Sequence, residues 1–200
     1  SKLHPSVAAF FKDYLANEKV RVFDGRYVVN THFPPFPSPA FDNLVEHFGD
    51  IGNVEARRLY SVTLAVTNRC SYRCWHCYNA GRSRKDTPLH VLRDVIHELQ
   101  DMGVVRVTLT GGEPLKRKDL ESITGAFDDR ASLNLNTTGD GLTAERAASL
   151  RDNGLFALGV SIDSKNPEEH DRMRGRKGAF TTALRALELA VKNNLYPYII

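Results

Sequence analysis

Residues 61–81, SVTLAVTNRCSYRCWHCYNAG, join a β-branched apolar run to a loop that contains all three cysteines of the chain. The run SVTLAVT has the composition of a buried strand. Three similar runs follow along the chain: RVTLT (106–110), SLNLNT (132–137) and FALGVSI (156–162). Segments with helical periodicity separate these runs. Strands that alternate with helices pair in parallel through right-handed crossovers, so the sequence predicts an α/β fold.

Three helices are predicted between and after these strands. TPLHVLRDVIHELQDMG (87–103) places Thr87 at the capping position ahead of a periodic apolar face. LTAERAASLRDNG (142–154) is predicted to form a second helix, with Thr143 at its capping position. The third helix is expected in GAFTTALRALELAVKNN (178–194), and its predicted buried face consists of Phe180, Ala183, Leu184, Leu187 and Val191.

Residues 1–60 differ in pattern from the rest and are predicted to form a small α+β appendage before a core at 61–200. Its expected elements are a helix (5–17), a β-hairpin (20–33) around Asp24-Gly25, a proline-rich loop (34–39) and a second helix (41–49). Asp-Gly between two β-rich runs is a strong hairpin signal. The prolines of PPFPSP exclude a helix or a central strand over 34–39.

The core contains about four strand–helix units and the start of a fifth strand at YPYII (196–200). A parallel sheet that stops within a new strand leaves an apolar edge exposed. We therefore expect the 200 residues to be one segment of a longer polypeptide. The alternative is that YPYII closes a small open sheet.

Composition restricts the class of protein. With 42% hydrophobic and 26% charged residues, the chain resembles an ordinary globular protein, and its formal net charge of +3 is too small to indicate nucleic-acid binding. No apolar run approaches the roughly 20 residues that span a bilayer, and no signal peptide is evident. The sequence predicts a cytoplasmic protein, and its clustered, odd cysteines favour a metal site over disulfides.

Each loop that follows a predicted strand carries unusual residues. The cysteine loop follows the first strand, and GGEP (111–114), TGDG (138–141) and SIDS (161–164) follow the next three. In parallel α/β folds, binding and chemistry concentrate at the carboxyl ends of the strands. These loops are therefore expected to surround one site.

The spacing C-x3-C-x2-C of Cys70, Cys74 and Cys77 admits three interpretations. Three thiolates on one loop can bind three corners of a cubane iron–sulfur cluster and leave the fourth iron open. The same cysteines with His76 could form a Cys3His zinc site. A third interpretation is three buried structural cysteines without a metal.

CSYRCWHCY together with GGEP resembles the radical S-adenosylmethionine (radical SAM) family. NTTG (136–139) and SIDSKNPEEHDRMRG (161–175) also resemble segments of that family, so the resemblance covers about 61–200. It implies a partial TIM-like (β/α) barrel of about four βα units plus the start of a fifth strand. It also implies a [4Fe–4S] cluster bound by Cys70, Cys74 and Cys77.

The resemblance further implies contacts with S-adenosylmethionine (SAM). In GGEP, Glu113 would accept from the SAM amino group, Ser161 and Asp163 would meet the ribose diol, and Arg174 would pair with the carboxylate. His76 would cover the adenine, and Asn136 would lie near the ribose or substrate. The full set is His76, Gly111, Gly112, Glu113, Pro114, Asn136, Ser161, Asp163 and Arg174. Each of these residues also has a purely structural interpretation. In that interpretation GGEP is only a turn, Asp163 caps the next turn and Arg174 belongs to a solvated basic run.

The reaction implied by the resemblance begins when the reduced cluster passes one electron to the sulfonium of SAM. The S–C5′ bond then breaks to give methionine and a 5′-deoxyadenosyl radical, which removes a hydrogen atom from the substrate. The motifs look most similar to the SPASM-type branch, which matures peptides or builds cofactors. Its members often carry auxiliary clusters on a cysteine-rich extension, which either lies beyond residue 200 here or is lacking in this enzyme.

The partners implied are a small-molecule or peptide substrate and a low-potential electron donor such as flavodoxin or ferredoxin. Basic stretches at 82–85 and 116–118 could meet an anionic substrate or an acidic donor, or form a solvated face. The appendage could bind a peptide or serve as a structural collar. The alternative function is a zinc-stabilised interaction module without catalysis.

Overall fold

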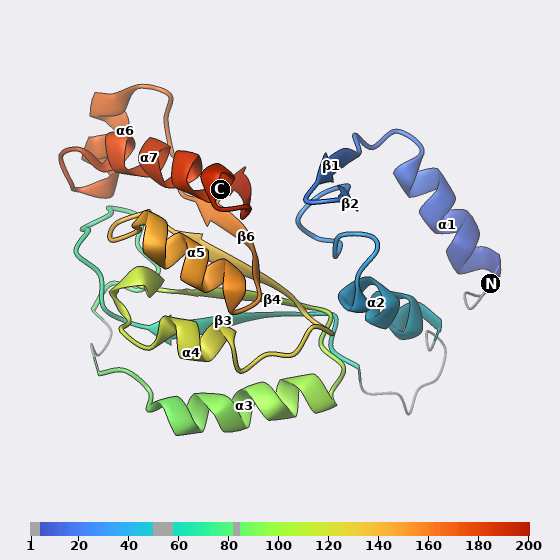
Figure 1. Ribbon diagram of the computed structural model, residues 1–200. Helices are drawn as coiled ribbons and strands as arrows, with labels where there is room; N and C mark the ends of the chain where they lie inside the picture. The colour runs from blue at the N-terminus through green and yellow to red at the C-terminus, as the bar shows by residue number, and fades with distance from the viewer. Residues whose placement is uncertain (1–4, 50–57, 82–84) are drawn as a thin grey trace.

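The computed structural model describes residues 5–49, 58–81 and 85–200 (Figure 1). The appendage contains α1 (Pro5–Leu15), β1 (Arg21–Phe23), β2 (Arg26–Val28) and α2 (Pro39–Gly49). The core begins with β3 (Ser61–Thr67), α3 (Leu89–Asp101), β4 (Arg106–Gly111), the 3-10 turn η1 (Pro114–Lys116) and α4 (Leu120–Thr124). It continues with β5 (Ser132–Thr137), α5 (Ala144–Asp152), β6 (Leu155–Val160), α6 (Pro167–Arg174), α7 (Ala179–Lys192) and β7 (Tyr196–Ile199).

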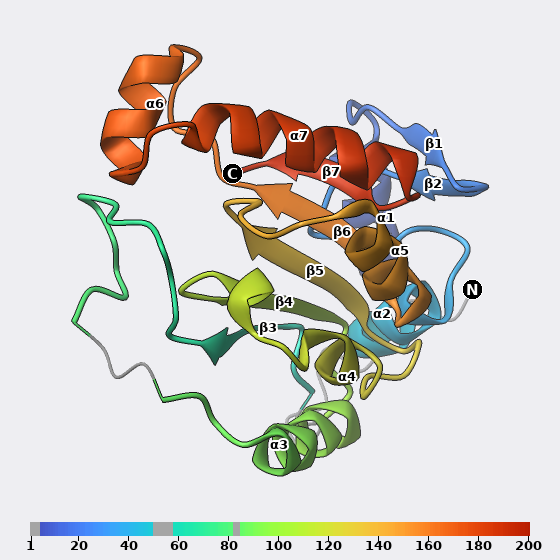
Figure 2. The same cartoon turned by 60° about the vertical axis from the view of Figure 1, so that its left-hand side comes forward.

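The core is a five-stranded sheet in the order β3-β4-β5-β6-β7, and every neighbouring pair is parallel. This order follows the sequence, as expected for successive right-handed βα crossovers. The strand arrows in Figure 2 point toward the cysteine loop and α6, and the appendage lies near the ends where the strands begin. The predicted α/β class and partial barrel are confirmed.

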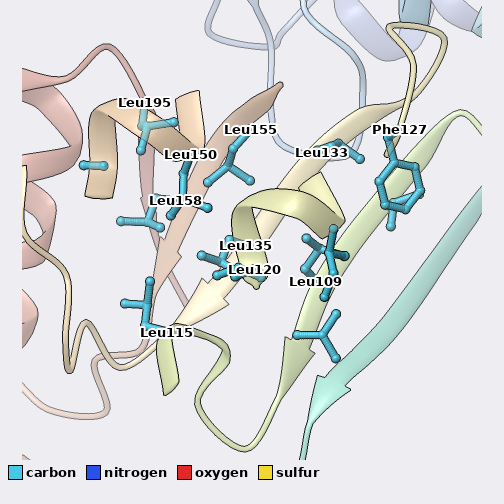
Figure 3. Packing of buried hydrophobic residues seen from close by; sticks show 14 of the residues in the cluster. Leu109, Leu115, Leu120, Phe127, Leu133, Leu135, Leu150, Leu155, Leu158 and Leu195 are labelled. Carbon is cyan, nitrogen blue, oxygen red and sulfur yellow. The ribbon is translucent and has the colours of Figure 1, made fainter. Parts of the chain in front are cut away.

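The two faces of the sheet differ in polarity. Val107 and Leu109 of β4 are fully buried against the helices, whereas alternate residues such as Thr108 point to the opposite face. Figure 3 shows leucines of β4, β5 and β6 packed with leucines of η1, α4 and α5. Burial of each such side chain contributes about 1.5–3 kcal/mol. The apolar face therefore stabilises the fold, and the polar face is left for the site.

The local predictions for the appendage hairpin and the α5 cap are confirmed. Asp24 and Gly25 both have positive φ, 48° and 71°, as a two-residue type I′ turn requires. The hydroxyl of Thr143 accepts a hydrogen bond from Arg146 N at the start of α5. The proline-rich loop ends one residue earlier than predicted, because Pro39 is already the first residue of α2.

Two helix predictions are wrong in detail. Thr87 does not cap α3, because the helix begins at Leu89 with Pro88 in the N-cap position and no side-chain cap. The predicted apolar face of α7 is also rotated, since Leu184 and Val191 are 42% and 56% exposed. The residues that α7 buries are Ala179, Ala183, Ala186 and Ala190. Small side chains let this helix pack close to the sheet, which its leucines could not do.

The appendage is joined to the core by polar and aromatic contacts. The buried amide of Asn43 in α2 donates to the carbonyl oxygens of Val104, at 3.1 Å, and Arg130, at 2.9 Å. The ring of Phe23 in β1 contacts those of Phe156 in β6 and Tyr196 in β7, with centroid distances of 6.5 Å and 5.3 Å. The division into segments 1–60 and 61–200 stays a prediction. In the described ranges, no helix is long and apolar enough to cross a membrane.

Replacing Asn43 with alanine should lower the free energy of unfolding by about 1–3 kcal/mol, because the buried carbonyl of Val104 and the partly buried carbonyl of Arg130 lose their donor. Urea denaturation would measure the loss. Asp42→Asn, an exposed change on the same helix, is the matched control and should alter stability by less than about 1 kcal/mol. Equal losses in both variants would contradict the anchoring role of Asn43.

Candidate functional site

A cavity of ≈ 550 Å³ lies at the carboxyl ends of the strands. This volume is within the range of about 300–1,000 Å³ that is typical of small-molecule sites. The predicted site residues that line it are Cys70, Cys74, His76, Cys77, Gly111, Gly112, Asn136, Ser161 and Arg174. Glu113, Pro114 and Asp163 lie behind this lining. Loops distant in sequence therefore meet around one cavity, as predicted from their place after the strands.

A second cavity of ≈ 500 Å³ lies at the opposite end of the sheet, between the hairpin and the loops that precede the strands. Its lining includes Arg26, Asp128 and Arg151 but none of the predicted site residues. We assign the candidate site to the first cavity, because the cysteines and all four strand-end loops converge there.

The three cysteine thiols are free, with Cys77 exposed and Cys70 and Cys74 partly buried. Burial raises the pKa of the Cys70 thiol, and a hydrogen bond from Tyr72 N to its sulfur opposes that rise. The interpretation as three buried structural cysteines is therefore wrong. In the part of the chain that the structure describes, no three His, Cys, Asp or Glu side chains converge on a single-ion site.

The two glycines of GGEP hold the cysteine loop against the end of β4. A Cβ on Gly111, whose φ is 143°, would lie 2.1 Å from Thr67 O, and one on Gly112 would lie 2.3 Å from Arg69 O. Gly112 N donates to Thr67 O, and Glu113 N donates to Arg69 O, both at 2.7 Å. Only glycine allows this approach of two backbones. The close contact of these glycines is therefore with the base of the cysteine loop.

The carboxylate of Glu113 is completely buried and accepts four hydrogen bonds. Its Oε1 accepts from Leu115 N at 3.0 Å and the Thr137 hydroxyl at 2.6 Å. Its Oε2 accepts from Thr138 N at 2.7 Å and the Thr138 hydroxyl at 2.6 Å. Burial raises the pKa of Glu113, whereas these donors favour the charged form. Because a carboxylate has about four acceptor positions, a SAM ammonium would have to displace a protein donor.

Asp163 and Arg174 form an ion pair at the edge of the cavity. Arg174 Nη2 donates to Asp163 Oδ1 at 2.8 Å. Arg174 Nε lies 2.6 Å from Asp163 Oδ2 without forming a hydrogen bond, so this second contact is ionic. His76 Nε2 lies 3.9 Å from Asp163 Oδ1. Arg174 is buried and paired, so it is not part of a solvated basic run.

The capping alternative for Asp163 is wrong, because the side chain of Asn166 caps α6 by accepting from Glu169 N. Instead, the backbone N–H of Asp163 donates to Nδ1 of His170 at 3.2 Å. His170 is buried, and burial lowers its pKa, with a further contribution from the Arg174 guanidinium. This hydrogen bond requires the neutral imidazole with its proton on Nε2.

Sequence reasoning missed Thr137, Thr138 and His170, which support the predicted residues from behind. The threonines belong to NTTG (136–139), which resembles the family, but their contact with Glu113 forms only in the folded protein. The second threonine supplies two of the donors to Glu113. His170 carried no signal, because its function depends on a contact that forms only in the folded protein.

Glu113→Gln should destabilise the protein by about 1–3 kcal/mol. Each oxygen accepts from one backbone N–H, so either orientation of the glutamine amide points its NH₂ group at a backbone donor. Urea denaturation measures the effect, with the exposed Glu98→Gln as the matched control. If Glu113→Gln unfolded at the same urea concentration as the unmodified protein, the Glu113 carboxylate would not be held by these four donors.

His170 should make stability depend on pH. Because its pKa is lowered in the folded state, the unfolded chain binds the proton more readily as the pH falls below about 6.5, the ordinary value for histidine. The free energy of unfolding should therefore decrease between about pH 7 and pH 5.5. His170→Asn, which keeps an acceptor but does not titrate, should show a shallower decrease. If the free energy of unfolding fell equally with pH in the unmodified protein and in His170→Asn, His170 would not be the source of the pH dependence.

Comparison with known proteins agrees with this geometry. The model of the Radical SAM superfamily matches residues 64–199. A GTP 3′,8-cyclase of Tolumonas auensis is 30% identical over 167 residues, which are 80% of this chain and 47% of that protein. A GTP 3′,8-cyclase of Xanthomonas axonopodis pv. citri is 33% identical over 145 residues, 67% of this chain and 43% of that protein. The chain thus spans about half the length of the curated relatives it matches.

Solved structures share the fold. The crystal structure of BtrN in complex with AdoMet and 2-DOIA has a TM-score of 0.53 at 21% identity, covering 70% of this chain and 56% of BtrN. Native anSMEcpe with bound AdoMet and a Cp18Cys peptide has a TM-score of 0.57 at 20% identity, covering 70% of this chain and 42% of the anSMEcpe chain. At this identity the likeness concerns the fold alone. With the family match over more than half of its residues, the chain belongs to the radical SAM superfamily.

Proposed function

We propose that this chain is the catalytic core of a radical SAM enzyme, in which Cys70, Cys74 and Cys77 bind a [4Fe–4S] cluster. The observation that carries the proposal is that all three free thiols line one cavity together with Ser161 and Arg174. Soft thiolate ligands are the donors that iron–sulfur clusters prefer. The donor set and the cavity therefore fit the cluster and its SAM ligand.

When bound, the cluster and SAM supply one-electron cleavage of SAM and a radical that abstracts a hydrogen atom. The protein's contribution is position and charge. Arg174 is the proposed partner of the SAM carboxylate, because its planar guanidinium suits a carboxylate and its Nη1 lies 3.9 Å from the Cys74 sulfur. To bind that carboxylate, Arg174 has to exchange at least part of its pairing with Asp163.

The remaining contacts with SAM are assigned from position in the cavity. Asn136 lies near the end of β5, Ser161 directly follows the neighbouring β6, and both line the cavity wall on which the ribose would lie. His76 is proposed to cover the adenine, and Asp163, once released by Arg174, to meet the ribose diol. Glu113 and Pro114 are proposed to support the amino-group site from behind the cavity wall, because Glu113 is occupied by four protein donors.

We further propose a small polar substrate. The relatives at about 30% identity are named for a reaction of GTP, a small-molecule substrate. The face of the sheet that leads into the cavity is also polar, with Tyr198 donating to Asn136 Oδ1 at 2.6 Å. A peptide substrate has no comparable support, and in the described part of the chain no appendage residue lines the cavity. A flavodoxin- or ferredoxin-like donor would supply the electron.

The proposal predicts four irons per chain after anaerobic reconstitution of the full-length protein. Electron paramagnetic resonance of the reduced protein should give a [4Fe–4S]⁺ signal whose g-values shift when SAM is added. Cys74→Ser should lose the signal because one corner loses its thiolate. Ser71→Ala, in the same loop, is the matched control and should keep it. Stoichiometric zinc and no signal would refute the proposal in favour of an interaction module.

A further inference from the structure

We infer that the turn at the end of α6, Met173–Gly175, is a positioning element that fixes the cysteine loop for cluster binding. The inference rests on the proposed function of that loop. It assigns a positioning role to one further residue, Gly175. Figure 2 shows α6 at the same end of the sheet as the cysteine loop, although about 100 residues separate Cys74 from Arg174.

The turn pairs with the cysteine loop through the backbone on both sides of Cys74. Arg73 N donates to Arg174 O at 3.2 Å, and Trp75 N donates to Met173 O at 3.3 Å. The Cys74 sulfur lies 3.7 Å from the same Arg174 carbonyl. Both neighbours of this proposed cluster ligand are therefore held by one turn, which restricts where its sulfur can point.

Gly175 brings the two backbones together. It ends α6 in the left-handed conformation, with φ 59° and ψ 33°. A Cβ at this position would lie 2.4 Å from Arg73 O and 2.9 Å from Arg73 C. These atoms belong to the backbone of the cysteine loop, so they cannot rotate away as a flexible side chain would. Any side chain at 175 must therefore push the loop and the turn apart.

The turn can act as a support because the C-terminal half of α6 is itself anchored twice. The Asp171 carboxylate accepts from Gly178 N at 2.5 Å and Phe180 N at 2.9 Å, which ties α6 to the start of α7. The second anchor is Arg174, the last residue of α6, which donates to Asp163 in the segment after β6. The cysteine loop, which has no helix or strand between residues 68 and 81, rests on this anchored turn.

Gly25, in the hairpin of the appendage, provides a matched control outside α6 and the cysteine loop. It also has a left-handed φ, 71°, but a Cβ there would meet nothing within 4 Å. Gly175→Ala and Gly25→Ala therefore introduce the same residue and similar backbone strain. They differ in whether the new methyl group contacts the cysteine loop.

The experiment compares both variants with the unmodified full-length protein after anaerobic reconstitution. It measures iron and sulfide per chain, the electron paramagnetic resonance signal with and without SAM, and the melting temperature before reconstitution. We expect Gly175→Ala to lose at least half of the bound iron and Gly25→Ala to keep it, with similar falls in melting temperature. Full iron with unchanged g-values in Gly175→Ala, or equal iron loss in both variants, would overturn the inference.

If Gly175→Ala does not fold, Asp171→Asn tests the same support without touching the cysteine loop. Loosening α6 should speed the release of iron to a chelator at least several-fold, whereas Glu168→Gln on the same helix should not. Release at the unmodified rate from Asp171→Asn would overturn the inference. Failure of the proposed function is distinguishable, because the unmodified protein itself would then bind no [4Fe–4S] cluster.

Discussion

The cysteine loop has no regular secondary structure of its own, so its shape depends on the backbones that lie against it. On one side, Gly112 brings the end of β4 against Arg69, and on the other side Gly175 brings the end of α6 against Arg73. In both places a Cβ would clash with a loop carbonyl oxygen. Two glycines from distant parts of the sequence therefore define the space in which the three thiols are held.

Charge is the second constraint on the site, because buried charged groups are costly unless they are paired or hydrogen-bonded. Glu113 is satisfied by four donors, and Arg174 is neutralised by Asp163. At the rim, Lys116 lies 2.8 Å from Asp140, which also accepts from the Ser71 hydroxyl. Glu113, Asp163 and Arg174 are thus partnered within the protein, and a charged ligand group that binds to one of them has to replace a protein partner.

The fold separates stability from chemistry. Leucines and valines on one face of the sheet pack beneath the helices, while polar residues on the other face lead to the cavity at the strand ends. The appendage joins the opposite end through Asn43 and the aromatic contacts of Phe23 with Phe156 and Tyr196. These contacts agree better with a structural collar than with a peptide-binding wall of the described cavity.

The sequence by itself determined the features that depend on local pattern. Strand periodicity, the Asp24-Gly25 turn, the Thr143 cap and the clustered cysteines could be predicted because each depends on residues close together in the chain. Only the tertiary structure decided that α7 buries its alanines and that Gly175 touches the cysteine loop. It likewise decided that Glu113 is occupied and that Asp163 pairs with Arg174. These facts depend on distances between segments far apart in sequence, which are fixed only when the sheet and its helices have packed.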